Sequence, residues 1–275
     1  MSFDNLFHGD KDTPNHSQWR IRAESLLADR DIWHPTATKY FPLGAIAEAR
    51  DGRKWRYCEE GGNGLSKAMV NAAAAETTNW TYIAQTNSPD VPAVGDKIVT
   101  VTLTSTAVAG AFIDGYLFCP DGTGEGDMYT IKNNKAGTTN TAGGYDIVCE
   151  IADAGGIRTA LVVASDLSLI ANLYKDVVVM PTTPVMPCVG VNNVAVTANY
   201  FFWSQVKGPC AVLASDTDDL TAVIGDEMAV TVTEGAASLP DNADGTATGD
   251  TIIGYLMKNA AATSDYVIVD LTIEI

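Results

Sequence analysis

The chain has 275 residues, 46% of them apolar, and its 34 acidic against 17 basic residues give a net charge of −17. This length allows one large or two ordinary domains, and so acidic a chain argues against nucleic-acid binding through its surface. No membrane span is expected, because the most apolar segment, residues 177–191, is interrupted by three prolines and is shorter than the roughly 20 residues that a spanning helix needs.

The N-terminal 40 residues are poor in core-forming side chains. Residues 17–31 are expected to form a short helix with Trp19 and Leu26 on one side, ending at His34-Pro35, because the residue before a proline avoids the helical region. Residues 1–56 carry a net charge of +1, whereas residues 57–275 carry −18. The segment is either a helix packed on its own domain or an arm that becomes ordered on a partner. It has no basic region followed by an apolar core, so a secretory signal is not expected.

Residues 41–62, FPLGAIAEARDGRKWRYCEEGG, predict a β-hairpin that turns at Asp51-Gly52. Trp55 and Tyr57 alternate with basic residues beyond the turn. A lone hairpin is marginally stable in water, so it must pack against something. The two aromatic side chains either cover the protein's own core or contact a partner.

From about residue 89 the pattern becomes β. Residues 267–275 alternate apolar and polar side chains, which is typical of a half-buried strand. Before this region, residues 65–76 predict a short helix capped by Ser66, or else an irregular loop. The other expected strands are residues 99–104, 112–119, 147–151, 161–164, 177–180, 200–206, 211–214, 228–232 and 251–258.

These elements predict a mainly β protein with one or two β-sandwich or barrel-like modules and an extended N-terminal arm. We expect residues 1–60 to form the arm and hairpin, residues 61–183 a first β module and residues 184–275 a second one, because MPTTPVMPCVG (180–190) has the composition of a linker. Two short stretches each resemble a later one. VGDKIVTVT, which begins at residue 94, resembles IGDEMAVTV, which begins at residue 224, and IDGYLF at residue 113 resembles IIGYLM at residue 252. Chance and duplication both account for them.

The sequence contains no motif for catalysis, and we expect neither an enzyme nor a cofactor. All three histidines precede residue 35, so a histidine-based mechanism would have to use the N-terminal arm, and the β region has no histidine of its own to activate its cysteines. The five cysteines are odd in number and lack CxxC spacing, which predicts reduced, mostly buried thiols without a disulfide. The acidic turn at residues 121–127 is either a calcium site that does not follow the EF-hand pattern or a solvated turn. The acidic segments DTDD (216–219) and DNADG (241–245) are expected to be solvated surface loops.

Three stretches together resemble head decoration proteins of tailed bacteriophages. These are the hairpin of residues 41–62, NYFFWSQVKGPCAVL (199–213) and GDTIIGYLMKNAAATSDYVIVDLTIEI (249–275). The resemblance implies a mainly β, non-enzymatic virion protein that binds the outer surface of the capsid and stabilises it. Its implied partners are the major capsid protein and itself, as a homotrimer, with no nucleic acid and no membrane, after synthesis in the host bacterial cytoplasm. The alternatives are a carbohydrate-binding or adhesin-like β protein of the virion, the major capsid protein itself, and a β-fold hydrolase. The lack of a long predicted helix disfavours the major capsid protein.

The less acidic N-terminal part is the expected attachment element, since it is freer of the charge repulsion of the rest. For Trp203, Gln205, Gly208 and Pro209, a core strand that ends in a tight turn is favoured over a subunit contact. The candidate residues of the capsid or subunit interface are Trp19, Arg20, Arg22, Leu26, Trp33, Arg53, Trp55, Arg56 and Tyr57.

Overall fold

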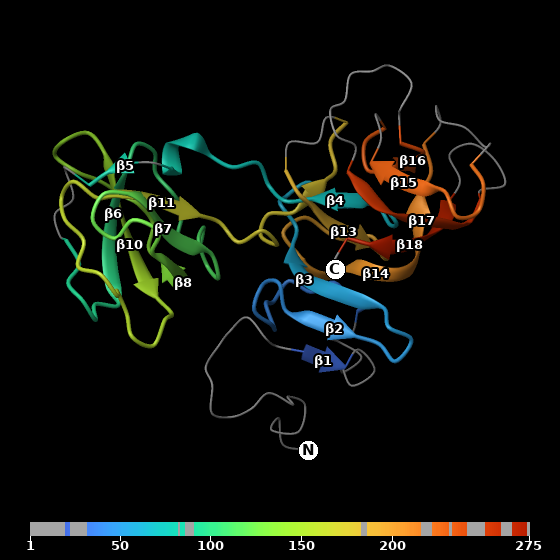
Figure 1. The fold of residues 1–275 in the computed structure, drawn as a ribbon, viewed down its shortest axis with the longest axis horizontal. Coiled ribbons are helices and arrows are strands. Elements are labelled where there is room, and N and C mark those ends of the chain that lie inside the picture. Colours follow the sequence, from blue (N-terminus) through green and yellow to red (C-terminus); the bar gives the residue numbers. More distant parts are fainter. Residues whose placement is uncertain are drawn as a thin grey trace. The chain divides into compact units, whose positions relative to one another are not determined.

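A computed structural model divides the chain into two compact units (Figure 1). Unit 1 comprises residues 1–75 and 173–275, and unit 2, residues 76–172, is inserted within it. The structure describes residues 20–22, 32–81, 83–85, 91–182, 186–215, 222–230, 233–240, 251–259 and 266–273.

Unit 1 is built on a sheet of eleven described strands. Its main path runs in the order β1-β2-β3-β14-β18-β17-β15-β16, and β4 pairs with β12 and β13, while β13 also pairs with β14. Neighbouring strands are antiparallel except for β1 and β2. The long strand β14 lies between β3 and β18 (Figure 1). The strands are β1 (Arg20–Arg22), β2 (Ile46–Glu48), β3 (Lys54–Glu59), β4 (Val70–Ala72), β12 (Val178–Val179), β13 (Cys188–Asn192), β14 (Phe201–Leu213), β15 (Glu227–Val230), β16 (Ala237–Ser238), β17 (Ile252–Lys258) and β18 (Tyr266–Thr272).

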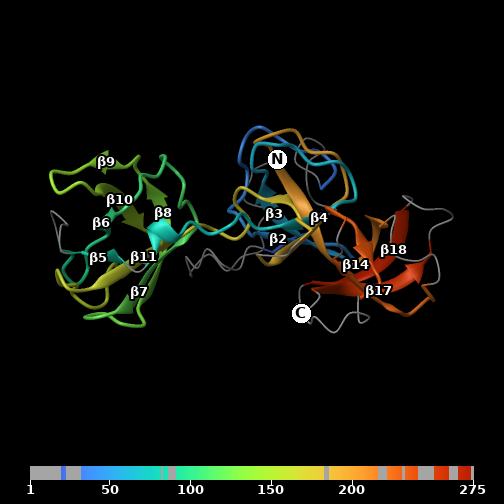
Figure 2. The same cartoon turned by 90° about the horizontal axis from the view of Figure 1, so that it is seen from above.

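Unit 2 is a second antiparallel sheet, whose path runs in the order β5-β11-β7-β8-β10-β6, with β9 paired to β10. The sheet curls around its own core, as both views show (Figures 1 and 2). The expected mainly β, barrel-like fold is therefore confirmed. The strands are β5 (Ile83–Ala84), β6 (Ile98–Leu103), β7 (Tyr116–Asp121), β8 (Met128–Asn134), β9 (Thr138–Thr139), β10 (Tyr145–Ile151) and β11 (Asp166–Ile170), and one 3₁₀ turn, η4 (Thr78–Trp80), precedes them.

Each unit has apolar clusters of its own. In unit 2, alternate residues of β6, β7, β8 and β10 pack around the fully buried Phe112 and Tyr129. In unit 1, one cluster lies under β14, β17 and β18, and another gathers Cys58, Val177 and Phe202. Within the described part of the chain, no helix is long and apolar enough to cross a bilayer.

The observed division differs from the expected boundaries at residues 60 and 183. Val178 pairs with Ala72, and Val191 pairs with both Val70 and Gln205, so residues 61–75 and the segment from residue 173 onward belong to one sheet. The proline-rich stretch is not a linker between modules, because β13 begins within it at Cys188. Residues 32–60 likewise belong to unit 1 and are not an arm.

Several local expectations are wrong. Residues 20–22, inside the helix expected at residues 17–31, form strand β1, and the rest of that stretch lies outside the described residues. Residues 65–76 are not helical: residues 70–72 form strand β4, and the residues around them have the irregular structure that was the alternative. Residues 161–164 lie in a turn, and the two strands expected at 200–206 and 211–214 are one continuous strand. In strands β4 and β14, the pairing with distant strands overrides a weak local propensity.

The first of the two sequence repeats is also a structural repeat. In unit 2, the backbone N–H of Ala93 donates to Asp96 Oδ2 at 2.8 Å, and in unit 1 that of Val223 donates to Asp226 Oδ2 at 2.7 Å. The glycine inside each turn has a positive φ, +93° at Gly95 and +101° at Gly225, which explains why glycine occupies both positions. The second repeat lies on β7 and β17, which occupy different places in the two sheet orders.

Candidate functional site

The predicted hairpin at Asp51-Gly52 is present. Strands β2 and β3 pair antiparallel, with Glu48 opposite Lys54. The N–H of Ala49 donates to the carbonyl of Arg53 at 2.9 Å, and Gly52, at φ +88°, takes the left-handed position of a three-residue loop. The N–H and guanidinium of Arg53 both donate to the Asp51 carboxylate, and these contacts, the backbone one first, hold the pKa of Asp51 below its usual value.

The hairpin packs on β14, and this contact answers the question of what stabilises it. Trp203 lies opposite Tyr57 across the β3–β14 pair, and their ring centroids are 5.0 Å apart. Phe41 closes over both rings, at 5.2 Å from Tyr57 and 5.4 Å from Trp203. Burial raises the pKa of Tyr57 to about 12, although the Tyr40 N–H donates to its hydroxyl. The aromatic residues of the hairpin thus belong to the core of unit 1.

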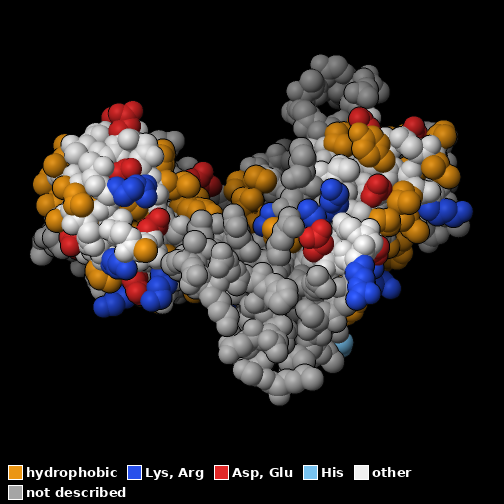
Figure 3. Space-filling view, turned by 60° about the horizontal axis from the view of Figure 1, so that its bottom comes forward, with side chains coloured by type: hydrophobic (Ala, Val, Ile, Leu, Met, Phe, Trp, Pro, Cys, Tyr) orange, Lys and Arg blue, Asp and Glu red, His pale blue; other side chains and the backbone are white. Residues whose placement is uncertain are grey.

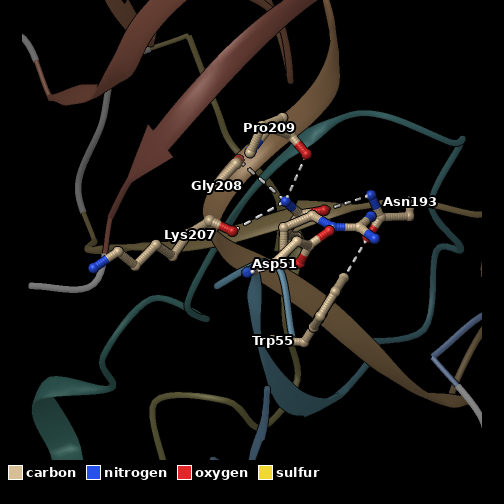
Figure 4. A network of polar contacts seen from close by, with 8 residues as sticks. Asp51, Trp55, Asn193, Lys207, Gly208 and Pro209 are labelled. Atoms are coloured by element: carbon tan, nitrogen blue, oxygen red, sulfur yellow. Dashed lines mark hydrogen bonds and ion pairs between the residues drawn. The ribbon is translucent and has the colours of Figure 1, made fainter. Parts of the chain in front are cut away.

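A partly buried polar network joins the hairpin to β14 (Figure 4). The indole N–H of Trp55 donates to Asn193 Oδ1 at 2.9 Å, and Asn193 Nδ2 donates to Gln205 Oε1 at 3.0 Å. The Gln205 Nε2 then lies within hydrogen-bond distance of three successive backbone carbonyls, those of residues 207, 208 and 209, at 3.1, 3.1 and 2.9 Å, and they share its two N–H groups. Both polar atoms of the Asn193 and Gln205 amides are thereby satisfied inside the protein, which makes the network rigid.

The three carbonyls belong to a β-bulge in the middle of β14. The register to β3 shifts between Gln205 and Lys207. Gly208 has φ +82°, and a Cβ there would lie 2.8 Å from Arg53 Cγ, so glycine is required. The expected core position of Trp203 and Gln205 is confirmed, but the Gly-Pro pair forms a bulge within a strand and does not end it.

Basic side chains gather at the end of the hairpin beside the bulge. Arg53 lies over the Trp55 ring, with 5.2 Å between Cζ and the ring centroid, and forms a 2.7 Å ion pair with Asp51. Lys54 and Lys207 are direct cross-strand neighbours, an arrangement of like charges that is destabilising in a sheet. We call these three basic residues, together with the exposed Arg50, the basic tip.

The structure separates the candidate interface residues. Trp55 and Tyr57 are buried, so the alternative in which they cover the protein's own core holds. Arg56 donates to the carbonyl of Gly44 at 2.8 Å and lies over the Tyr174 ring. Trp33 is 46% exposed and Arg53 is at the surface. The remaining candidates are Trp19 and Leu26, which lie outside the described residues, and Arg20 and Arg22, which lie in β1.

Sequence reasoning missed two residues of this region. Asn193, which links the Trp55 indole to Gln205, lies in a polar turn with no distinguishing pattern. Lys207 had a signal, because a lysine directly before Gly-Pro in an apolar strand indicates a bulge that turns a charged side chain outward.

The described residues contain little reactive chemistry. Among them, no group of three or more His, Cys, Asp or Glu side chains could hold a metal ion. In the turn considered for calcium, Asp121 accepts from Gly122 N–H, whereas Asp127 accepts from Tyr129 and pairs with Arg158. All five cysteines are free, and burial raises the pKa of Cys149 and Cys210 to about 12, so their thiols are poor nucleophiles at neutral pH.

In comparisons with models of protein families, with curated proteins and with solved structures, the chain has no match.

Proposed function

We propose that this chain is a non-enzymatic structural protein of a tailed-phage virion, which binds the outer surface of the capsid and stabilises it. The sequence resemblance of the hairpin, β14 and the two final strands suggests this function. The basic tip is the structural observation that carries it.

A rigid basic tip in a chain of net charge −17 is suited to an acidic partner surface. The tip is fixed by the Trp55–Asn193–Gln205 network, so little ordering entropy is lost when it docks. An acidic group placed between Lys54 and Lys207 would relieve their mutual repulsion. The proposed partner is therefore an acidic patch of the major capsid protein.

Stabilisation would come from repetition. The same contact of modest affinity would be made at every symmetric position of the shell. Each bound copy that spans two capsid subunits would link them, so the total stabilisation would be large. On this proposal the protein acts on the virion exterior after synthesis in the bacterial cytoplasm, and it needs neither cofactor nor catalytic group.

The test is charge reversal at the tip. Full-length protein with Lys54→Glu and Lys207→Glu is mixed with bare phage heads, and co-sedimentation is measured. We expect the affinity to fall at least about tenfold, since each lost contact to a charged group is worth roughly 1.5–3 kcal/mol. The matched control reverses two exposed lysines of unit 2, Lys97→Glu and Lys135→Glu, which changes the net charge equally.

Equal loss of binding in both double variants would mean that net charge, and not the tip, controls attachment. Undiminished binding of the tip variant would contradict the proposal. A truncation tests the contribution of the N-terminal segment, but removal of residues 1–40 would cut into unit 1, because Thr36 and Phe201 exchange backbone hydrogen bonds of 2.9 and 2.8 Å. Removal of residues 1–19 leaves this pairing intact.

Exposed aromatic residues favour a carbohydrate-binding role as the second candidate. Trp33 and Tyr40 of unit 1 are 46% and 39% exposed, and such rings can stack on sugars. Binding of the isolated protein to a glycan array, lost on Trp33→Ala, would support this role, whereas decoration of heads that survives Trp33→Ala would favour the first.

A further inference from the structure

The loop after β3 contains the only Asn-Gly pair of the sequence, Asn63-Gly64. An asparagine deamidates spontaneously most readily when glycine follows it, because glycine has no side chain that keeps its backbone nitrogen away from the asparagine side chain. Asn63 is exposed to solvent. Its rate of deamidation therefore depends on how the fold holds the backbone of this loop.

The reaction replaces a bond to hydrogen by a bond to carbon at the backbone nitrogen of Gly64. This nitrogen loses its proton and attacks Cγ of Asn63, while the side-chain nitrogen of Asn63 takes up a proton and leaves as ammonia. The product is a five-membered succinimide ring. Water then opens the ring at either of its two carbonyl carbons, which gives aspartate or isoaspartate. One water molecule is consumed and one ammonia molecule is released, so the chain needs neither a cofactor nor an enzyme for this step.

The fold occupies the position where the new bond must form. Gly64 N–H donates to Oε1 of Glu60 at 2.7 Å, and Asn63 N–H donates to the same oxygen at 2.9 Å. In the succinimide, Cγ of Asn63 takes the place of the hydrogen on the Gly64 nitrogen, so the ring cannot close while that hydrogen is bound to Glu60. Glu60 is 1% exposed, and hydrogen bonds to a carboxylate are among the stronger ones in proteins. This bond is therefore a barrier to deamidation.

The residues on both sides of the pair are fixed as well. Gly62 and Asn199 donate their N–H groups to the second oxygen of the same carboxylate, both at 2.7 Å. Leu65 and Val196 exchange backbone hydrogen bonds of 2.9 and 2.8 Å. The loop can release the Gly64 nitrogen only by a local opening in which several of these bonds break together.

We propose that Asn63 is a site of spontaneous deamidation and that Glu60 sets the rate of the reaction. While the carboxylate holds the loop, Asn63 reacts slowly although it is exposed. Whenever the loop opens, the Gly64 nitrogen can attack. Because hydrolysis of the ring does not restore asparagine, the converted fraction records how long the loop has been open. The inference concerns the isolated chain and does not depend on the proposed capsid function.

Deamidation would weaken the connection between β3 and β14. It adds a negative charge near the Glu60 carboxylate, in a chain of net charge −17 whose acidic side chains are visible on the surfaces of both units (Figure 3). Isoaspartate also inserts an additional carbon into the backbone between residues 63 and 64, so the N–H groups that meet Glu60 lose their present spacing. Since Glu60 also binds Asn199, which leads into β14, the modified chain should unfold more readily.

The experiment follows the full-length protein at mildly alkaline pH, both folded and in urea. Peptides that contain residue 63 are analysed by mass spectrometry for the mass increase of about 1 Da that deamidation causes, and chromatography separates aspartate from isoaspartate. We expect Asn63 to react at least about tenfold faster in urea than in the folded wild type, where the loop opens only transiently. Glu60→Ala should raise the rate in the folded protein at least about tenfold, and Glu60→Gln, which keeps part of the hydrogen bonds, should raise it less.

The matched control is Gln205→Ala, which should also destabilise unit 1 but removes hydrogen bonds at the β-bulge and not in this loop. Urea unfolding gives the unfolded fraction of each variant. For Gln205→Ala, this fraction multiplied by the rate in urea should account for the whole reaction, whereas the Glu60 variants should exceed it. If Glu60→Ala does not fold, Glu60→Gln, which keeps the size of the side chain, decides the comparison.

Three results would overturn the proposal: equal rates in the folded wild type and in urea, an Asn63 that stays intact in urea, or Glu60 variants that react no faster than their unfolded fractions require. A slower reaction in the Glu60 variants would mean that the carboxylate acts as a base that assists the attack, and this result would overturn it too. Because no measurement involves phage heads, none of these outcomes bears on the proposed function.

Discussion

Glu60 should be one of the most sensitive single positions for the stability of unit 1. Its side chain is 1% exposed, and its carboxylate accepts four backbone N–H bonds. Oε1 accepts from Asn63 at 2.9 Å and Gly64 at 2.7 Å, and Oε2 accepts from Gly62 and Asn199, both at 2.7 Å. One side chain thus ties the glycine-rich loop after β3 to the residues that lead into β14.

The substitution Glu60→Gln keeps the size of the side chain and replaces one oxygen by an NH₂ group. That group faces two N–H donors, so two hydrogen bonds are lost and two donors stay buried without a partner. Hydrogen bonds to charged groups contribute roughly 1.5–3 kcal/mol each, and such losses are not additive. We therefore expect the free energy of unfolding to fall by about 2–4 kcal/mol.

The assay is urea unfolding at pH 7, combined with hydrogen exchange of the amides of residues 62, 63, 64 and 199. The matched control is Glu59→Gln, one residue earlier, where the carboxylate is partly exposed and forms a 3.1 Å ion pair with Lys175. Lys175 keeps a second carboxylate partner, Asp176 at 3.1 Å, so the loss should be about 1 kcal/mol or less. The reasoning is refuted if Glu60→Gln costs no more than Glu59→Gln and the four amides keep their protection.

Three further predictions follow from the packing. Gln205→Ala should lower the free energy of unfolding by about 2–4 kcal/mol, because the carbonyls of residues 207, 208 and 209 lose the amide that donates to them, and a loss below about 1 kcal/mol in urea unfolding would contradict this. Stability should decrease from about pH 8.5 upward, because the thiols of the unfolded chain lose their protons there, whereas Cys149 and Cys210 of the folded protein, with pKa values of about 12, keep theirs. Each of the two thiols lowers the free energy of unfolding by up to roughly 1.4 kcal/mol per pH unit in this range. Equal urea midpoints at pH 8 and pH 10 under reducing conditions would exclude this effect. A fragment of residues 76–172 should fold alone, because its core uses only its own residues; a spectrum without strand signal and the lack of a cooperative thermal transition would disprove it.

Local patterns alone determined several elements correctly. The alternation of β18, the strand at residues 98–103 and the hairpin at Asp51-Gly52 are visible in consecutive residues, because a strand's two faces and a turn's φ angles restrict neighbouring positions directly. The repeated Gly-Asp pair at residues 95–96 and 225–226 is visible in the sequence as a similarity, and the structure shows that both copies form the same turn.

Pairing between distant segments was decided only by the tertiary structure. The alanine-rich stretch around residue 72 became strand β4 because β12 and β13, more than 100 residues later, offer it backbone partners. The same pairing joins the two segments of unit 1 that precede and follow unit 2 in the sequence, and no composition change marks this division. Trp55 has the appearance of an exposed anchor in its own hairpin, but it is buried beside β14, and Asn193, 138 residues away, accepts its indole N–H. Whether a side chain faces solvent or the core depends on which strand lies beside it, and a neighbouring strand can come from any part of the chain.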